Sequence, residues 1–189
     1  LAVSFTRLLV APGKTKSLFV TRDHIQTLAR GSEAGGEITA FERLMINQVF
    51  TLQLKTAEQV MTPIGQVVTA APDDTLAACF ERVRSSGHLR LPVIDPATRA
   101  CAGVLDTFEV LTSGKLNPDA RARDHMRPPF FVAAGLPADD ILPLLRRRRQ
   151  TVAVVRAGDS EAVRGIVTQE NILSTLISGA LPAAKSSAT

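Results

Sequence analysis

The sequence contains no tryptophan and no tyrosine, and only eight of its 189 residues are phenylalanine. Its core must therefore be built from valine, leucine, isoleucine and alanine, which suits small layers of helix and sheet. The two cysteines, Cys79 and Cys101, match no metal-ligand spacing, and Cys79 shares a helical face with Leu76, Phe80 and Val83. We therefore expect buried free thiols in a reducing compartment.

The sequence also has no signal peptide and no apolar run long enough to cross a membrane. Because it begins at Leu1 rather than Met, we expect a soluble piece of a longer protein, whose parent can still be a membrane protein. Its three histidines, His24, His88 and His125, are far apart and match no metal pattern. A nucleophile elbow and a Walker-type phosphate loop are missing as well, so we expect a non-enzyme with no catalytic or metal site.

The charge balance is mildly basic, with a net charge of +4 and a pI near 9.6. This suits an anionic ligand or an anionic membrane face, but it is too weak to indicate nucleic acid. The run Arg146–Arg149 ends a predicted helix, where cations are favourable and are usually only solvated. Contact with an anionic lipid surface is a less favoured alternative for this run.

The N-terminal third is predicted to hold two helices. The first begins at about Thr21, and the stretch GSEAGGE at 31–37 is predicted to break it. The second runs from about residue 37 to 53, with Thr39 and Glu42 spaced as a capping box. An apolar stripe on the second helix is expected to be packing surface: Phe41, Leu44, Met45, Val49 and Leu52.

The remainder contains an internal repeat, because VMTPIGQVVTA at 60–70 is echoed by HMRPPFFVAAG at 125–135. After this β-rich opening, the first copy is predicted to continue as a helix at about 74–86, a strand at 89–95, and a strand and helix at 102–111. The second copy is predicted to do so at about 138–149, 151–157 and 164–173. Both units thus run β-α-β-β-α, with Gly103 aligned to Gly165 and Glu109 aligned to Asn171.

Such a unit is too small to cover both faces of its sheet, so we expect an α/β (α+β) fold with the two repeats packed sheet to sheet and clefts between them. The predicted core consists of Val67, Val68, Leu91, Val93, Val132, Val152, Val154 and Ile166. The apolar faces of the helices at 74–86 and 138–149 exceed what one small sheet can cover, which favours a homodimer. These faces carry Leu76, Phe80, Val83, Ile141 and Leu145.

The two copies differ at the start of their last helix. Thr168 begins this helix in the second copy, where it can either seat a phosphate at the positive helix end or simply cap the helix. Asp106 stands at the same place in the first copy, with Glu109 three residues later. Two carboxylates there would repel a phosphate, so we assign Asp106 to capping alone and favour the phosphate at Thr168.

Several motifs resemble those of a tandem CBS-domain pair, or Bateman module. GVLDTFE and GIVTQEN stand in place of the family's Gly-h-h-Ser/Thr-x-x-Asp, where h is hydrophobic, and RLPVID stands in place of x-Pro-Val. The stretch GGEITAFERLMINQVFTLQLKTAEQVMTP at 35–63, with SSGHLRLPV further on, is similar to the CorC/HlyC and CNNM group. These are membrane proteins linked to magnesium and cobalt efflux, with cytosolic CBS pairs. The similarity covers roughly residues 20 to 178.

This resemblance implies an organisation for the chain. Residues 1–57 would be a linker with helices that leaves a membrane domain, 58–115 and 122–178 the two CBS repeats, and 179–189 a disordered tail. The module would be a homodimer on the cytoplasmic face of the inner or plasma membrane, attached to the transmembrane domain of its own parent chain. It would control a Mg or Co transporter domain and would not bind nucleic acid.

The resemblance also implies a regulatory adenine nucleotide (AMP, ADP or ATP, alone or with Mg²⁺). Apolar strand residues would enclose the adenine, Asn171 would meet the ribose, and Thr168 with Arg90 would meet the phosphates. The predicted nucleotide-binding residues are Thr62, Val67, Val68, Arg90, Pro92, Val132, Val152, Thr168 and Asn171. His88 is expected in a solvated loop. The alternative is a structural dimerisation module whose nucleotide sites have decayed, which Glu109 and Asn171 favour because the family has Asp at both positions.

Overall fold

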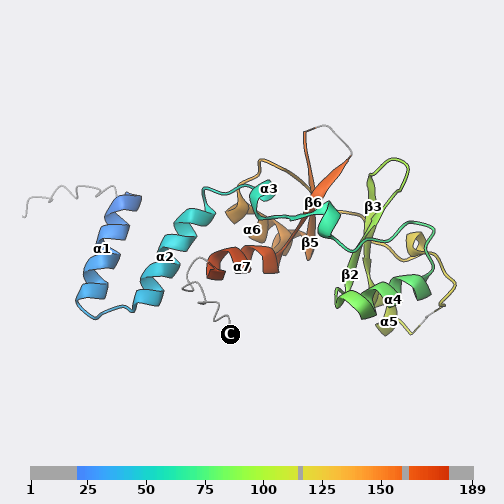
Figure 1. Cartoon of the computed structure of the whole chain (residues 1–189), viewed down its shortest axis with the longest axis horizontal. Helices are drawn as coiled ribbons and strands as arrows, with labels where there is room; N and C mark the ends of the chain where they lie inside the picture. Colours follow the sequence, from blue (N-terminus) through green and yellow to red (C-terminus); the bar gives the residue numbers. More distant parts are fainter. Residues whose placement is uncertain (1–20, 115–116, 159–161, 179–189) are drawn as a thin grey trace, which may run out of the picture.

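The N-terminal part of the chain forms a helical hairpin that projects from the rest of the molecule (Figure 1). The computed structural model describes residues 21–114, 117–158 and 162–178, so the expectations for 1–20 and 179–189 lie outside the described residues. The hairpin consists of α1 (Arg22–Ala34) and α2 (Ala40–Leu52). The predicted capping box is confirmed, with Thr39 and Glu42 bonded to each other's backbone N–H.

The predicted break falls within 31–37 but lies later than its first glycine, because α1 continues through Gly31 to Ala34. One glycine within a helix costs only about 1 kcal/mol relative to alanine, which is too little to end it here. The turn begins instead at Gly35, and Gly36 has a left-handed φ of 78°. The hairpin is joined by an ion pair between Glu33 and Arg43.

The two repeats follow the predicted order of helices and strands. The first contains α3 (Ala57–Val60), β1 (Thr62–Pro63), a 3-10 turn η1 (Ile64–Gln66), α4 (Leu76–Ser86), β2 (Arg90–Ile94), β3 (Cys101–Asp106) and α5 (Thr107–Thr112). The second contains η2 (Ala122–Asp124), β4 (Phe131–Ala133), α6 (Ala138–Arg148), β5 (Val152–Arg156), β6 (Val163–Thr168) and α7 (Gln169–Ser178). The opening strands are therefore much shorter than the β-rich sequence suggested.

Each opening segment crosses to the other repeat. β1 pairs antiparallel with β6, so the larger sheet has the order β1-β6-β5-β4, whereas β2 and β3 form a separate hairpin. In the reverse direction, Arg127 forms an antiparallel bridge with Val104 of β3. We call the crossing segments lead-in 1 (residues 56–63) and lead-in 2 (residues 120–127). Their exchange ties the two repeats into one unit.

The aligned glycines lie where the lead-ins cross. A Cβ atom on Gly103 would lie 2.6 Å from the sulfur of Met126 and 2.8 Å from the carbonyl oxygen of Arg127. A Cβ atom on Gly165 would lie 2.8 Å from the sulfur of Met61 and would overlap the carbonyl oxygen of Thr62. Glycine is thus required at both positions because another backbone passes against it.

The core confirms the packing of sheet on sheet. Cys101 of β3 meets Val154 and Val163 of the larger sheet in one hydrophobic cluster between the repeats. Each repeat also has a hydrophobic cluster of its own under its helices, and this cluster includes residues of the other repeat's lead-in. Both cysteines are buried and free as predicted, and burial raises the pKa of the Cys101 thiol to about 11.

The predicted core is correct at six of its eight positions. Val67 and Val68 are only half-buried, because the chain turns as η1 at Ile64–Gln66 and then runs along the surface between the repeats. The reason given for a dimer is also wrong, since Leu76, Ile141 and Leu145 are fully buried within one chain. Within the two repeats, exposed apolar side chains lie mainly on the last helix of each: Phe108 and Leu111 on α5, and Leu173 and Ile177 on α7. Others lie on or next to the N-terminal hairpin, at Leu28, Phe41, Val49 and Leu54.

Candidate functional site

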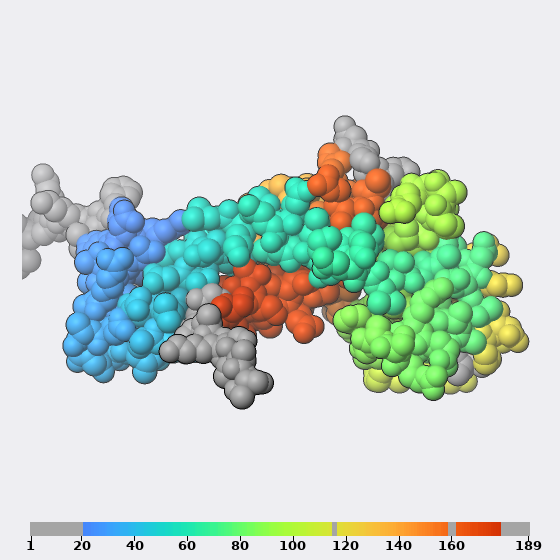
Figure 2. Space-filling model, viewed as in Figure 1, coloured from blue at the N-terminus to red at the C-terminus, as the bar shows by residue number. Residues whose placement is uncertain are grey.

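A cavity of about 700 Å³ lies between the two repeats. Its lining comes from Thr62 and the residues after η1, from the turn between α4 and β2, from the start of β5, and from the end of β6 with the first turns of α7. In the space-filling view the teal surface runs along the upper edge of the red surface and reaches the green surface of the first repeat (Figure 2). The cavity therefore lies where lead-in 1 crosses the seam between the repeats.

The structure brings most of the predicted nucleotide-binding residues into this lining. Seven of the nine face it: Thr62, Val67, Val68, Arg90, Val152, Thr168 and Asn171. Pro92 and Val132 do not line it, because both are buried on strands, Pro92 in β2 and Val132 in β4. The lining thus joins residues separated by more than 100 positions in the sequence.

Thr168 caps α7 and also faces the cavity. Its hydroxyl oxygen accepts a hydrogen bond from the backbone N–H of Asn171 at 3.2 Å, and its own N–H donates to Oδ1 of Asn171 at 2.8 Å. This reciprocal arrangement is that of a capping box, with asparagine in place of glutamate or glutamine. The first turn still has the N–H groups of Gln169 and Glu170, and both of these residues line the cavity.

Asn171 links this helix end to lead-in 1, because its Nδ2 donates to the hydroxyl of Thr62 at 3.0 Å. Its Oδ1 accepts from both the N–H and the hydroxyl of Thr168. An asparagine side chain offers two N–H donors and two acceptor lone pairs, so one N–H remains for a further partner. Asn171 can therefore donate one hydrogen bond to a ligand, but its oxygen is already used.

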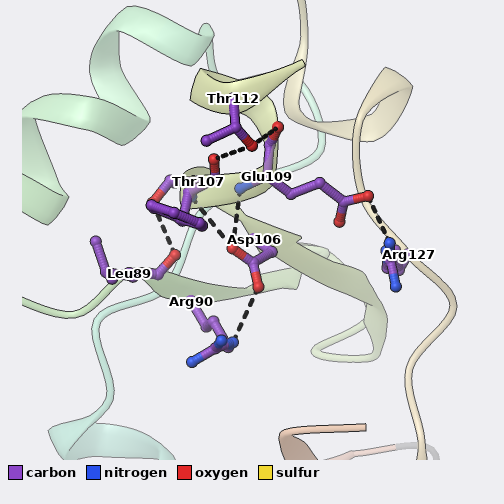
Figure 3. Close-up of polar contacts among 8 residues, drawn as sticks. Leu89, Arg90, Asp106, Thr107, Glu109, Thr112 and Arg127 are labelled. Atoms are coloured by element: carbon purple, nitrogen blue, oxygen red, sulfur yellow. Dashed lines mark hydrogen bonds and ion pairs between the residues drawn. The ribbon is translucent and has the colours of Figure 1, made fainter. Parts of the chain in front are cut away.

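The corresponding helix end in the first repeat is closed by carboxylates (Figure 3). Oδ1 of Asp106 accepts from the N–H groups of Phe108 at 3.1 Å and Glu109 at 3.2 Å, so the predicted cap is confirmed. Glu109 forms an ion pair with Arg127 of lead-in 2. This pair occupies the place that Asn171 and Thr62 occupy in the second repeat.

Asp106 does more than cap, which corrects its assignment to capping alone. Its Oδ2 lies 3.0 Å from Nε of Arg90, and the two residues are register partners on β2 and β3. Arg90 also lines the cavity near α7. Arg90 therefore connects the helix end of the first repeat with the cavity, a link that appears only once β2 and β3 are paired.

Other lining residues were not predicted from the sequence. The turn before β2 contributes Gly87, His88 and Leu89, and Gly87 has a left-handed φ of 75° that ends α4. His88 was expected in a solvated loop, and it is exposed and also lines the cavity. These residues could have been predicted from the position of SSGHLR directly before β2, because the start of β2 lies at the cavity between the repeats.

A smaller cavity of about 340 Å³ includes Asp74, Arg82 and Arg99 in its lining. Arg82 forms an ion pair with Asp74, and its hydrogen bond lowers the pKa of that carboxyl. Among residues 21–114, 117–158 and 162–178, no cluster of histidine, cysteine and acidic side chains is suited to a metal ion. Within the same ranges no helix has the length and apolar character needed to cross a membrane.

Comparison with known proteins identifies the repeats. The family model of the CBS domain matches residues 57–113 and 122–178. The chain is 30% identical over 159 residues to the magnesium and cobalt efflux protein CorC of Pasteurella multocida, covering 82% of this chain and 52% of CorC. It is 22% identical over 171 residues to the UPF0053 protein YrkA of Bacillus subtilis, covering 88% of this chain and 39% of YrkA. The chain thus spans about half or less of these relatives.

Solved structures share the fold. The CBS domain of the bacterial CNNM/CorC family Mg²⁺ transporter superposes with a TM-score of 0.75 at 24% identity, covering 84% of this chain and 96% of that one. The same domain in complex with ATP gives a TM-score of 0.65 at 24% identity, covering 72% of this chain and 96% of that one. The chain belongs to the CBS domain family and is a tandem CBS pair of the kind found in the CorC and CNNM group.

Proposed function

We propose that this chain is a regulatory CBS pair that binds one adenine nucleotide in the cavity between its repeats. The observation that carries the proposal is the lining of that cavity. It combines apolar side chains from both repeats with a threonine, the first-turn residues of α7 and an arginine. A volume of about 700 Å³ lies within the usual range of about 300–1,000 Å³ for small-molecule sites. The related CBS domain solved with ATP supports the choice of ligand class.

Each part of the nucleotide has a suitable partner in the lining. Val67, Val68 and Val152 offer apolar surface for the adenine ring. The N–H groups of Gln169 and Glu170 and the positive end of α7 suit the phosphates, with Arg90 as the cation. The remaining N–H of Asn171 suits a ribose hydroxyl.

The helix end of the first repeat has a different role in this proposal. Asp106 already accepts from the N–H groups of this helix end, and Glu109 pairs with Arg127, so the two carboxylates leave no site for a second phosphate. The module then binds one nucleotide per chain rather than two. This asymmetry follows from the two residues that replace Thr168 and Asn171 in the first repeat.

The packing of α7 offers a route from the cavity to a membrane domain. The first turn of α7 borders the cavity, and α7 packs against α2 of the N-terminal hairpin. Ordering of α7 by a nucleotide would therefore act on α2, which precedes the repeats in the chain. In this proposal the parent protein carries a transmembrane Mg or Co transporter domain, with the module at the cytoplasmic face of the inner or plasma membrane. The module itself is not an enzyme and binds no nucleic acid.

We further propose that two modules form a homodimer through the last helix of each repeat. Phe108 is 58% exposed and Leu111 50% exposed on α5, and Leu173 is 49% exposed on α7. Exposed apolar side chains on both closing helices suit an interface between two copies.

Titration calorimetry with AMP, ADP and ATP, each with and without Mg²⁺, tests the binding proposal. The Thr168 hydroxyl donates to Oδ1 of Asn171 in the unliganded chain, and in this proposal a bound phosphate replaces Oδ1 as its acceptor. Thr168→Val keeps the side-chain shape but removes this hydroxyl, and we expect the affinity to fall roughly ten- to a hundredfold. Thr39→Val is the matched control, because it removes the same kind of capping hydroxyl from α2, far from the cavity. Equal affinities for the two variants would show that Thr168 is only a cap.

The alternative function is a dimerisation module without a working nucleotide site. Two observations favour it: the oxygen of Asn171 is fully engaged, and Glu109 is paired with Arg127. This alternative predicts a dimer in light scattering together with no heat of binding and no thermal stabilisation by any of the three nucleotides.

A further inference from the structure

Among the residues that the structure describes, Arg90 is the sole arginine or lysine in the lining of the cavity between the repeats. Its Nε donates to Oδ2 of Asp106 at 3.0 Å. Among the described residues, the Arg90 side chain has no other hydrogen-bond or ion-pair partner. A guanidinium group carries five N–H donors, so its NH1 and NH2 groups remain able to meet a phosphate. The cation of the cavity therefore already has a carboxylate partner, Asp106 (Figure 3).

The position of Asp106 is fixed from two directions. Its Oδ1 is held by the N–H groups of Phe108 and Glu109 at the start of α5. The next residue, Thr107, is fully buried, and both its N–H and its hydroxyl donate to the carbonyl oxygen of Leu89, the neighbour of Arg90. The carboxylate and the arginine are thus tied to the same short piece of structure, and the pair is part of the folded repeat.

We propose, resting on the proposed nucleotide site, that Asp106 is an affinity-determining residue that acts through Arg90 and selects against the more highly charged nucleotides. Its carboxylate offsets the positive charge that Arg90 presents to the cavity, and Glu170 adds a second negative charge to the lining. The electrostatic repulsion between these carboxylates and the nucleotide grows with each phosphoryl group, because the interaction energy is proportional to the charge of the ligand. A nucleoside monophosphate is then favoured over a metal-free triphosphate.

The test is Asp106→Asn, measured by calorimetry with AMP and with ATP in buffer that contains a metal chelator. Asparagine caps helices about as well as aspartate, so the start of α5 is retained while the charge is removed. We expect the affinity for ATP to rise roughly two- to fivefold and that for AMP by less than about twofold, in line with an exposed ion pair. Added salt should shrink the difference, because the charges are partly exposed.

Glu109→Gln is the matched control. It removes the same charge from the same helix end, but Glu109 pairs with Arg127, which does not line the cavity. This control should leave both affinities within about twofold of the wild type. In an Arg90→Gln background, Asp106→Asn should have no more effect than Glu109→Gln, because the route through Arg90 is gone.

Two results overturn the inference. A fall in ATP affinity on Asp106→Asn would show that Asp106 orients Arg90 toward the phosphates instead of opposing them. An equal rise for Asp106→Asn and Glu109→Gln would show a general effect of net charge. If the wild type and all variants bind neither nucleotide, the proposed function fails as well, whereas binding with an unchanged ratio of ATP to AMP affinity overturns the inference alone.

Discussion

The crossing of lead-in 1 over Gly165 can be tested by adding a single carbon atom. In Gly165→Ala the new Cβ would overlap the carbonyl oxygen of Thr62 and would lie 2.8 Å from Sδ and 3.0 Å from Cγ of Met61. A methionine side chain can move aside, but the carbonyl belongs to the β1 backbone, which pairs with β6 at Pro63 and Gly165. The substitution must therefore push β1 away from the sheet.

Overpacking of this kind costs about 1–3 kcal/mol of unfolding free energy. Moving β1 also moves Thr62 away from Asn171, so we expect weaker nucleotide binding as well. Chemical denaturation followed by circular dichroism gives the stability, and calorimetry gives the affinity. Gly65→Ala is the control, because a Cβ there meets no atom within 4 Å and the backbone φ is not in the left-handed region.

We expect Gly65→Ala to be neutral or to stabilise the protein by up to about 1 kcal/mol, through the lower entropy of its unfolded state. If Gly165→Ala unfolds at the same denaturant concentration as Gly65→Ala, lead-in 1 does not lie against β6. The exchange of segments between the repeats would then be wrong, and with it the position of the cavity.

Three further predictions concern acid stability, the thiols and the dimer. Arg82 lowers the pKa of Asp74, so this pair stabilises the fold above the ordinary aspartate pKa and loses that contribution as the pH falls through the lowered pKa. Asp74→Asn should therefore lose less stability than the wild type between pH 7 and strongly acidic pH, as urea midpoints across this range will show. Burial raises the pKa of the thiols of Cys79 and Cys101, so iodoacetamide should modify them quickly only in denaturant, and rapid modification of the native protein would contradict their burial. Leu111→Asp with Leu173→Asp should convert the proposed dimer to a monomer in light scattering without a large loss of helix, whereas a persisting dimer would place the interface elsewhere.

The repeat and its order of helices and strands were predictable because they depend on local pattern. The Met-x-Pro echo, the aligned glycines and the alternation of apolar residues all lie within short stretches of sequence. The capping box at Thr39 was predictable for the same reason, because its two partners are three residues apart. The partial error at 31–37 came from treating Gly31 as a helix end, although packing of the hairpin outweighs the small cost of one glycine.

The exchange of lead-ins was not predictable, because it depends on contacts between residues distant in the sequence, about 100 positions apart for Thr62 and Ile166. Nothing in the sequence around Thr62 shows that it pairs with β6 rather than with β3. The contacts of Asp106 were likewise predictable only where they are local. Its cap on α5 was predicted, whereas its ion pair with Arg90 depends on the register of β2 and β3. The burial of Ile141 and Leu145 within one chain likewise follows from lead-in 1, which adds apolar surface to the second repeat.

The most direct test of the nucleotide site is a crystal structure of this chain grown with saturating AMP. We predict one nucleotide per chain in the cavity between the repeats, with its adenine against Val67, Val68 and Val152 and its phosphate between Arg90 and the first turn of α7. The helix end at Asp106 should keep its present contacts with Phe108 and Glu109. An empty cavity at saturating AMP, or a nucleotide bound at Asp106 instead, would contradict the account.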